Sequence, residues 1–140
     1  MSTLLLHFQP IAGKALDILD AILRTPEVAS CKKEFNALRL VCEELVVNVV
    51  DYAYPENDEE GYLDIEIEKD DACITIRFKD GGIPFNPLDR DMPDTSLPLE
   101  ERRIGGLGIF LTIKKMDDVT YDYVNNENIL SIKKNISNEE

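Results

Sequence analysis

Asp80-Gly81-Gly82-Ile83-Pro84-Phe85-Asn86-Pro87 is the stretch around which the chain is arranged. It follows a segment of strict apolar and polar alternation, and it opens a segment, residues 84–104, that holds four prolines and charges of both signs. Asp-Gly-Gly is good turn chemistry at the end of a strand, and a turn is by itself enough to explain the stretch. A loop as long as 84–104 in a compact domain is usually functional or mobile, so we expect a flexible lid there.

A second interpretation of the same stretch is a pocket for a flat, hydrogen-bonding ring. Asp80, at the end of a strand, would accept a hydrogen bond from an exocyclic amine, and Gly82 would let the backbone approach the ring closely. Pro84 and Phe85 would line the apolar side of the pocket. Taken alone, the stretch leaves both interpretations open.

The bulk composition favours one globular domain over residues 1–140. Hydrophobic residues make up 44% and charged residues 31% of the 140 positions, a globular balance. The net charge of -13 argues against a nucleic-acid surface and against binding to anionic membrane, because both need clustered Lys and Arg. No apolar run is long enough for a membrane span. Three cysteines without metal-ligand spacing favour a reducing, cytoplasmic location.

The first half of the chain predicts one strand and two helices. A strand is expected at Leu4–Phe8, closed by Pro10, and apolar residues at helical spacing predict a helix over Ile11–Leu23. Thr25-Pro26 is predicted to be a break. A second helix, densely apolar in its middle, is expected from about Ser30 or Lys32 to Tyr54.

The second half predicts a hairpin, a loop, a helix and a second hairpin. Tyr62–Glu68 and Ala72–Lys79 alternate apolar with polar residues, as antiparallel strands with one wet face do. A helix is expected over Gly106–Met116, and two last strands are expected at Asp118–Tyr123 and Ile129–Lys133. The order predicts an α+β, two-layer sandwich, with helices on one face of a mainly antiparallel sheet.

Glu44 and Asn48 interrupt the apolar run of the second predicted helix. Residues four apart lie on one face of a helix. In the structural interpretation Glu44 reaches water at the helix edge and Asn48 bonds a backbone group, as most buried polar groups do. In the functional one, both face a cavity. The Asn48 carbonyl oxygen then suits Mg²⁺, which takes few protein ligands, and Glu44 offers a base.

Gly105-Gly106-Leu107-Gly108 follows the proline-rich segment. It is explained either as the permissive start of a helix or as a phosphate-binding turn, because backbone N–H groups at a helix N-terminus point toward an anion. No Gly-Lys-Ser/Thr follows, so it is not the loop of P-loop enzymes, and its spacing does not match the dinucleotide fingerprint.

Together, these motifs resemble the Bergerat ATP-binding fold of gyrase, the heat-shock chaperones and histidine kinases, the GHKL superfamily. The chain is most similar to the small, stand-alone anti-sigma-factor serine/threonine kinases. Glu44-Leu-Val-Val-Asn48 resembles their N-box, Asp80 to Pro87 their first glycine box, and Gly105 to Leu111 their second. The resemblance covers nearly the whole chain.

The resemblance implies ATP and Mg²⁺ as cofactors and assigns roles by position. Glu44 lies where the family has its general base, Asn48 where it has the Mg²⁺ ligand, and Asp80 where it has the carboxylate that reads the adenine amine. Arg103, or Arg102 beside it, could supply positive charge to the γ-phosphate or to the partner protein. The remaining assigned residues shape the base pocket and the phosphate loop: Gly82, Pro84, Phe85, Gly105, Gly106, Leu107 and Gly108.

Two positions depart from the family pattern. Pro84 stands where many relatives have a second glycine, which would alter the flexibility of the lid. Asp51 stands where relatives often have a basic or neutral residue, and a second carboxylate near a triphosphate is unfavourable unless it pairs with a metal or a base.

The resemblance implies an anti-sigma regulator that phosphorylates a Ser or Thr of a small, STAS-like anti-anti-sigma partner and also sequesters a sigma factor. An alternative, motivated by Asp51, is a non-catalytic module whose bound ATP or ADP sets its affinity for a partner. A third, the catalytic domain of a histidine kinase, is disfavoured. The one His is His7, and no upstream pair of dimerisation helices is predicted that would carry a phospho-acceptor. Relatives are often dimers, so a homodimer is also an expectation.

Overall fold

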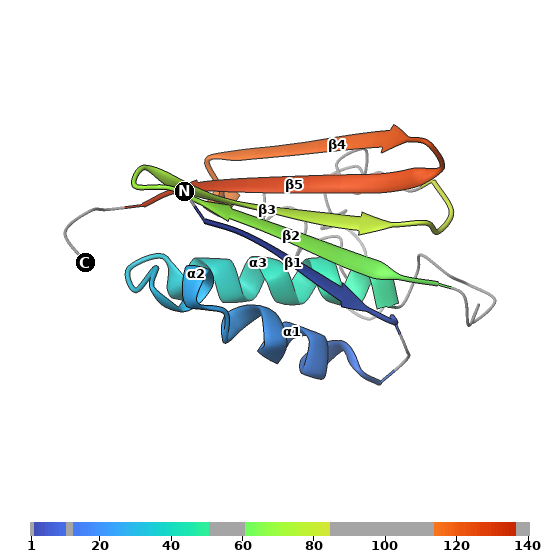
Figure 1. Ribbon diagram of the computed structural model, residues 1–140, viewed down its shortest axis with the longest axis horizontal. Helices are drawn as coiled ribbons and strands as arrows, with labels where there is room; N and C mark the ends of the chain where they lie inside the picture. Colours follow the sequence, from blue (N-terminus) through green and yellow to red (C-terminus); the bar gives the residue numbers. More distant parts are fainter. Residues whose placement is uncertain (1, 11–12, 51–60, 85–113, 137–140) are drawn as a thin grey trace, which may run out of the picture.

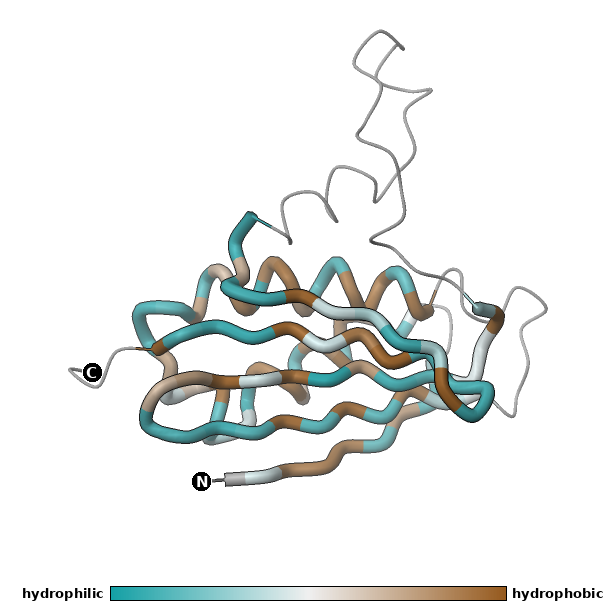
Figure 2. Tube along the Cα trace, turned by 90° about the horizontal axis from the view of Figure 1, so that it is seen from above, coloured by the Kyte–Doolittle hydropathy of each residue, from teal (hydrophilic) through white to brown (hydrophobic). Residues whose placement is uncertain are grey.

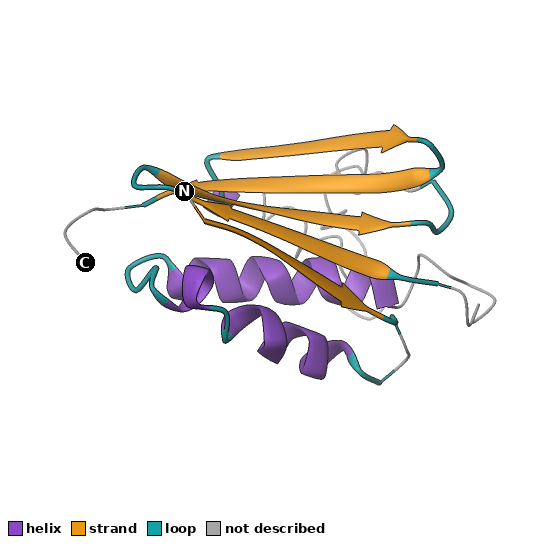
Figure 3. Ribbon diagram, viewed as in Figure 1, coloured by secondary structure: helices purple, strands orange, loops and turns teal. Residues whose placement is uncertain are grey.

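The computed structural model describes residues 2–10, 13–50, 61–84 and 114–136. In these residues three helices cover one face of a five-stranded sheet (Figure 1). Figure 3 shows the two layers, which confirm the predicted α+β sandwich. None of these helices is long and apolar enough to cross a membrane. In chain order the elements are β1 (Ser2–Phe8), α1 (Ala15–Leu23), α2 (Pro26–Ala29), α3 (Phe35–Asn48), β2 (Leu63–Lys69), β3 (Cys73–Asp80), β4 (Asp118–Val124) and β5 (Glu127–Asn135).

The sheet has the strand order β1-β2-β3-β5-β4, and every pairing in it is antiparallel. The turn between β2 and β3 is closed by Asp70, whose Oδ1 accepts from the backbone N–H of Ala72 at 2.7 Å and of Cys73 at 2.9 Å. Asn125 and Asn126, with φ of 55° and 63°, join β4 to β5 in the left-handed conformation that two-residue hairpin turns require. Because β5 lies beside β3, the first residues of β5 lie next to the last residues of β3.

The core lies between the sheet and the helices. Alternation along β2 and β3 turns one side chain in two toward the helices. Figure 2 shows the matching change of hydropathy along the strands as brown and teal bands. α3 supplies the facing apolar stripe. The fully buried residues of these three elements are Leu38, Val41, Cys42, Leu45, Val46, Leu63, Ile65, Ile67, Ile74, Ile76 and Phe78.

Thr25-Pro26 separates α1 from the next helix, which confirms the predicted break, but a short helix, α2, that was not predicted begins there. The Thr25 hydroxyl accepts from Val28 N–H at 3.4 Å and Pro26 takes the first position of α2, where its missing N–H costs nothing. The second long helix begins at Phe35, later than predicted. Its predicted end at 51–54 lies outside the described residues, as do the lid from Phe85 onward and most of the helix predicted over 106–116.

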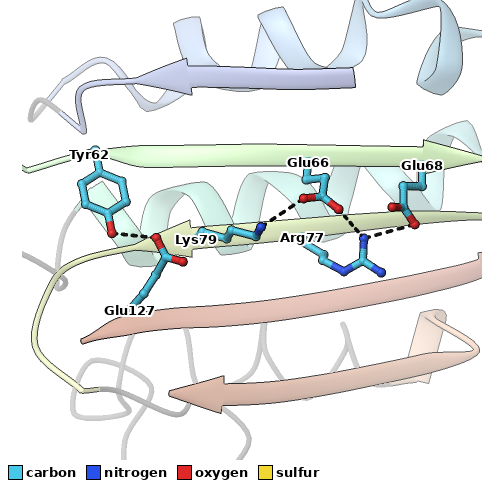
Figure 4. A network of polar contacts seen from close by, with 6 residues as sticks. All are labelled: Tyr62, Glu66, Glu68, Arg77, Lys79 and Glu127. Carbon is cyan, nitrogen blue, oxygen red and sulfur yellow. Dashed lines mark hydrogen bonds and ion pairs between the residues drawn. The ribbon is translucent and has the colours of Figure 1, made fainter. Parts of the chain in front are cut away.

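The sheet face away from the helices carries a network of ion pairs (Figure 4). Glu66 on β2 receives Lys79 Nζ at 3.0 Å and Arg77 Nη1 at 2.7 Å, both from β3, and Arg77 also reaches Glu68 at 3.2 Å. The hydrogen bond from Lys79 holds the pKa of Glu66 below its ordinary value of 4.5, with Arg77 adding to the effect and burial opposing it. The network therefore ties β2 to β3 across the wet face.

Glu66→Gln is expected to lower the free energy of unfolding by about 1 kcal/mol at pH 7, because the neutral amide loses its attraction to two cations. A carboxyl whose pKa falls on folding stabilises the protein above its unfolded value and loses that contribution as pH falls. The difference in unfolding free energy between wild type and Glu66→Gln should therefore disappear as pH drops below 4.5. Urea unfolding at several pH values measures it. Asp122→Asn, at an exposed β4 position, is the control, and an equal loss there would contradict the network's role.

Candidate functional site

α3 carries Glu44 and Asn48 toward the end of the sheet at which β3 also ends (Figure 1). The apolar stripe that buries Leu45 and Val46 against the sheet also turns Asn48 inward, where it is 6% exposed. Glu44, one helical turn earlier, is half-buried. The spacing of four puts both on one face, as predicted.

The Asn48 amide is only partly used by the protein. Its Nδ2 is buried and has no hydrogen-bond partner among the described residues. A buried donor left unpaired costs about 1–3 kcal/mol, and native proteins keep few of them. The structural interpretation, in which this amide simply bonds a backbone group, therefore does not account for Nδ2.

Asp80 is the last residue of β3 and lies on its helix-facing side, after Ile76 and Phe78. It is 6% exposed. Its Oδ1 accepts from Gly82 N–H at 2.9 Å and from Asn128 Nδ2 at 3.0 Å. Burial raises the pKa of the Asp80 carboxyl above its ordinary value of 3.8, and the negative charge of Glu127 adds to this, while the two donated hydrogen bonds lower it in part.

Asn128 is the residue of this site that the sequence analysis missed, because it fell in the predicted connector between the last two strands. It is the second residue of β5, it is 5% exposed, and it pairs with Asp80 in the strand register. Its Nδ2 also donates to the Ile83 carbonyl at 2.8 Å, and its Oδ1 accepts from the Tyr121 hydroxyl. The alternation of Asn128 with buried Leu130 and Ile132 was the available signal.

The two glycines of the turn, Gly81 and Gly82, have different surroundings. A Cβ on Gly81 would lie 2.8 Å from Cε1 of Tyr62, so a larger residue there would have to displace the Tyr62 ring. Figure 4 shows this ring on the wet face, its hydroxyl donating to Glu127 Oε2 at 2.7 Å. Gly82 instead gives its N–H to Asp80. The turn is thus bordered by the Tyr62 ring on the wet face and held by Asn128 from the helix side.

The described residues therefore bring part of the predicted site to one end of the fold. Asn48, Asp80 and Gly82 lie there, with Pro84 exposed just beyond the turn. His7, on the wet face, pairs with Asp64 and stacks on Tyr62. The other predicted site residues lie outside the described residues: Phe85, Arg103, Gly105, Gly106, Leu107 and Gly108.

The polar groups of this arrangement are chemically suited to bind a polar ring at Asp80 and a cation at Asn48. Asp80 offers Oδ2, which accepts no hydrogen bond from the described residues, in a buried position where an acceptor is strongly selective. Asn48 offers a neutral amide of the kind that Mg²⁺ accepts. No group of three or more His, Cys, Asp or Glu in the described residues could hold a metal, so an ion at Asn48 would need further ligands from its substrate.

Comparison with known proteins gives a family and a set of relatives. The profile of the histidine kinase-like ATPase domain matches residues 12–134. The serine-protein kinase RsbW of Listeria monocytogenes is 31% identical over 90 residues, which cover 61% of this chain and 57% of the relative. The serine-protein kinase RsbW of Staphylococcus aureus is 33% identical over 91 residues, which cover 59% and 54%. The match thus spans little more than half the length of either relative.

Asp80→Asn is expected to raise the free energy of unfolding at pH 7, because it keeps an oxygen for Gly82 and Asn128 and removes a buried charge. A carboxyl whose pKa rises on folding favours the folded state at low pH, and this advantage is lost as pH rises through its folded pKa. The extra stability of Asp80→Asn over wild type should therefore vanish below pH 3.8. Thermal unfolding between pH 3 and 8 measures it, with Asp122→Asn as control. If Asp80→Asn were less stable than wild type at pH 7, the buried charge of Asp80 would not be destabilising, and this interpretation would be wrong.

Proposed function

Because this chain belongs to the histidine kinase-like ATPase family, we propose that it binds ATP with Mg²⁺ and phosphorylates a serine or threonine of a partner protein. The observation that carries the proposal is the buried Asp80 carboxylate, held from one side with Oδ2 left as an acceptor. Its natural partner is the exocyclic amine of adenine. Both relatives carry the name of a serine-protein kinase, which supports protein over small-molecule phosphorylation.

The phosphate end of the site is assigned to α3 and to segments outside the described residues. The buried amide of Asn48 carries a carbonyl oxygen that fits a Mg²⁺ ligand, with the nucleotide supplying most other ligands. When bound, Mg²⁺ neutralises charge on the phosphates and aligns them for transfer. Gly105, Gly106, Leu107 and Gly108 are proposed to cradle the phosphates, with Arg103 adding positive charge. Gly82, Pro84 and Phe85 are proposed to flank the base.

Glu44 is proposed as the general base. It lies one turn before Asn48 on the same helix face and is half-buried, which suits a carboxylate that must meet a hydroxyl delivered from outside. Its Oε would accept the proton of the Ser or Thr hydroxyl as that oxygen attacks the γ-phosphorus, and ADP would leave. Such a base contributes about 10²–10⁴-fold to the rate.

The proposed substrate is a STAS-like anti-anti-sigma protein, and a sigma factor is proposed as the protein sequestered when the substrate is phosphorylated. These partners follow from the family resemblance. Cytoplasmic location and a homodimer complete the proposal. In the alternative, the same site binds ATP or ADP without transfer, and the bound nucleotide sets partner affinity.

Glu44→Gln is expected to keep Mg-ATP affinity and to lower phosphate transfer to a STAS-domain substrate by about 10²-fold or more. Radiolabelled γ-phosphate transfer measures the rate and isothermal titration measures affinity. Glu43→Gln is the matched control, because Glu43 neighbours Glu44 on α3 and pairs with Arg39 at 3.6 Å. It should transfer at close to the wild-type rate.

Transfer by Glu44→Gln at the wild-type rate would remove Glu44 from the chemistry. Nucleotide binding by wild type without transfer to any STAS-domain protein tested would favour the non-catalytic alternative. A wild-type protein that binds no nucleotide would refute both the kinase proposal and the non-catalytic alternative.

A further inference from the structure

Asn128 has no role assigned by the family resemblance, yet it holds the carboxylate on which base recognition depends. We infer that Asn128 determines base specificity: it orients Asp80 as a fixed hydrogen-bond acceptor and thereby selects a 6-aminopurine over a 6-oxopurine. The inference rests on the proposed nucleotide function. It names a positioning residue, because Asn128 acts through Asp80.

The orientation of the Asn128 amide is fixed by partners from three places in the fold. Its Nδ2 lies 3.0 Å from Asp80 Oδ1 and 2.8 Å from the Ile83 carbonyl oxygen, and its Oδ1 accepts from the Tyr121 hydroxyl. A flipped amide would set Oδ1 against two acceptors at hydrogen-bond distance. The side chain is 5% exposed, so water cannot readily relieve that repulsion. Nδ2 therefore stays toward Asp80.

This fixed donor decides what Asp80 can do. Oδ1 receives two N–H groups, from Gly82 and Asn128, and hydrogen bonds donated to a carboxylate favour its charged form. Oδ2 accepts no hydrogen bond from the described residues and is left as an acceptor. An amino group at position 6 of a purine donates to it, whereas an oxo group there would place a second acceptor against a buried charge. Sites of this kind reject the unmatched analogue strongly, because polar groups are left unpaired.

The same amide also ties the turn to the sheet. Ile83 is half-exposed, at 50%, but its carbonyl is bound to Asn128 from β5, and Tyr121 adds a link from β4. The backbone after Asp80 is thereby held at a set distance from the carboxylate. Preorganisation of this sort favours one ligand geometry.

The test compares ATP with inosine triphosphate, which carries an oxo group in place of the 6-amine, by isothermal titration with Mg²⁺. Wild type should prefer ATP by about 10²-fold. Asn128→Asp puts two carboxyls side by side, which share a proton and can then donate as well as accept. Its ATP Kd should rise at least about tenfold, and the preference for ATP should fall by a similar factor.

Asn126→Asp is the matched control. It makes the same chemical change two residues away, at an exposed turn position with φ of 63° that Asp also adopts, and its preference should stay within about twofold of wild type. Circular dichroism establishes that each variant is folded. Should Asn128→Asp fail to fold, Tyr121→Phe, which removes one hydroxyl acting through the amide, should lower the preference by about threefold.

A folded Asn128→Asp that keeps the wild-type preference would overturn the inference while leaving the proposed function intact, and so would an unchanged Tyr121→Phe if it is the variant that folds. Wild type that binds ATP and inosine triphosphate equally would also overturn it. Wild type that binds neither nucleotide would instead show that the proposed function is wrong, and the inference would fall with it.

Discussion

The burial of one carboxylate at the end of β3 is the constraint on which the site depends. Asp80 is 6% exposed and takes two hydrogen bonds on Oδ1, which do not fully offset the cost of removing a charge from water. The fold sustains this cost because Asp80 ends a strand whose other inward residues, Ile74, Ile76 and Phe78, are fully buried. The strand sets the position of the carboxylate, and the core keeps it dry.

Two polar groups at this end of the molecule are costly to bury. Asn48 on α3 brings an Nδ2 that has no hydrogen-bond partner among the described residues, and Asp80 on β3 brings a carboxyl with a raised pKa. Proteins tolerate such local violations where function requires them and stabilise themselves elsewhere. Here the compensation lies in the apolar layer between α3 and the sheet and in the ion pairs of Glu66 with Lys79 and Arg77. The sheet and the core thus supply the stability, and the end of β3 carries polar groups that are costly to bury. This division is the physical basis of the proposed function.

Much of the architecture could be predicted from local pattern, because alternation in 62–68 and 72–79 and helical spacing in 35–48 are properties of short stretches. The identity of neighbours could not. Asn128 faces Asp80 only because β5 pairs with β3, a contact across 48 residues that no periodicity encodes. Gly81 likewise looked like turn chemistry alone, whereas Tyr62 occupies the space beside it. Glu44, Asn48 and Asp80 could be proposed as candidates because their polar chemistry interrupts or ends apolar patterns.

The most direct test of the account is the titration of the Asp80 carboxyl by ¹³C NMR, in the free protein and with saturating Mg-ATP. The account predicts a pKa above 3.8 in the free protein and a lower pKa in the complex, because the amine of adenine donates to the charged form. It also requires that the Asp122 carboxyl, exposed on β4, be unaffected by nucleotide. An Asp80 pKa that is ordinary in the free protein, or that Mg-ATP leaves unchanged, would contradict the claim that this buried carboxylate reads the base.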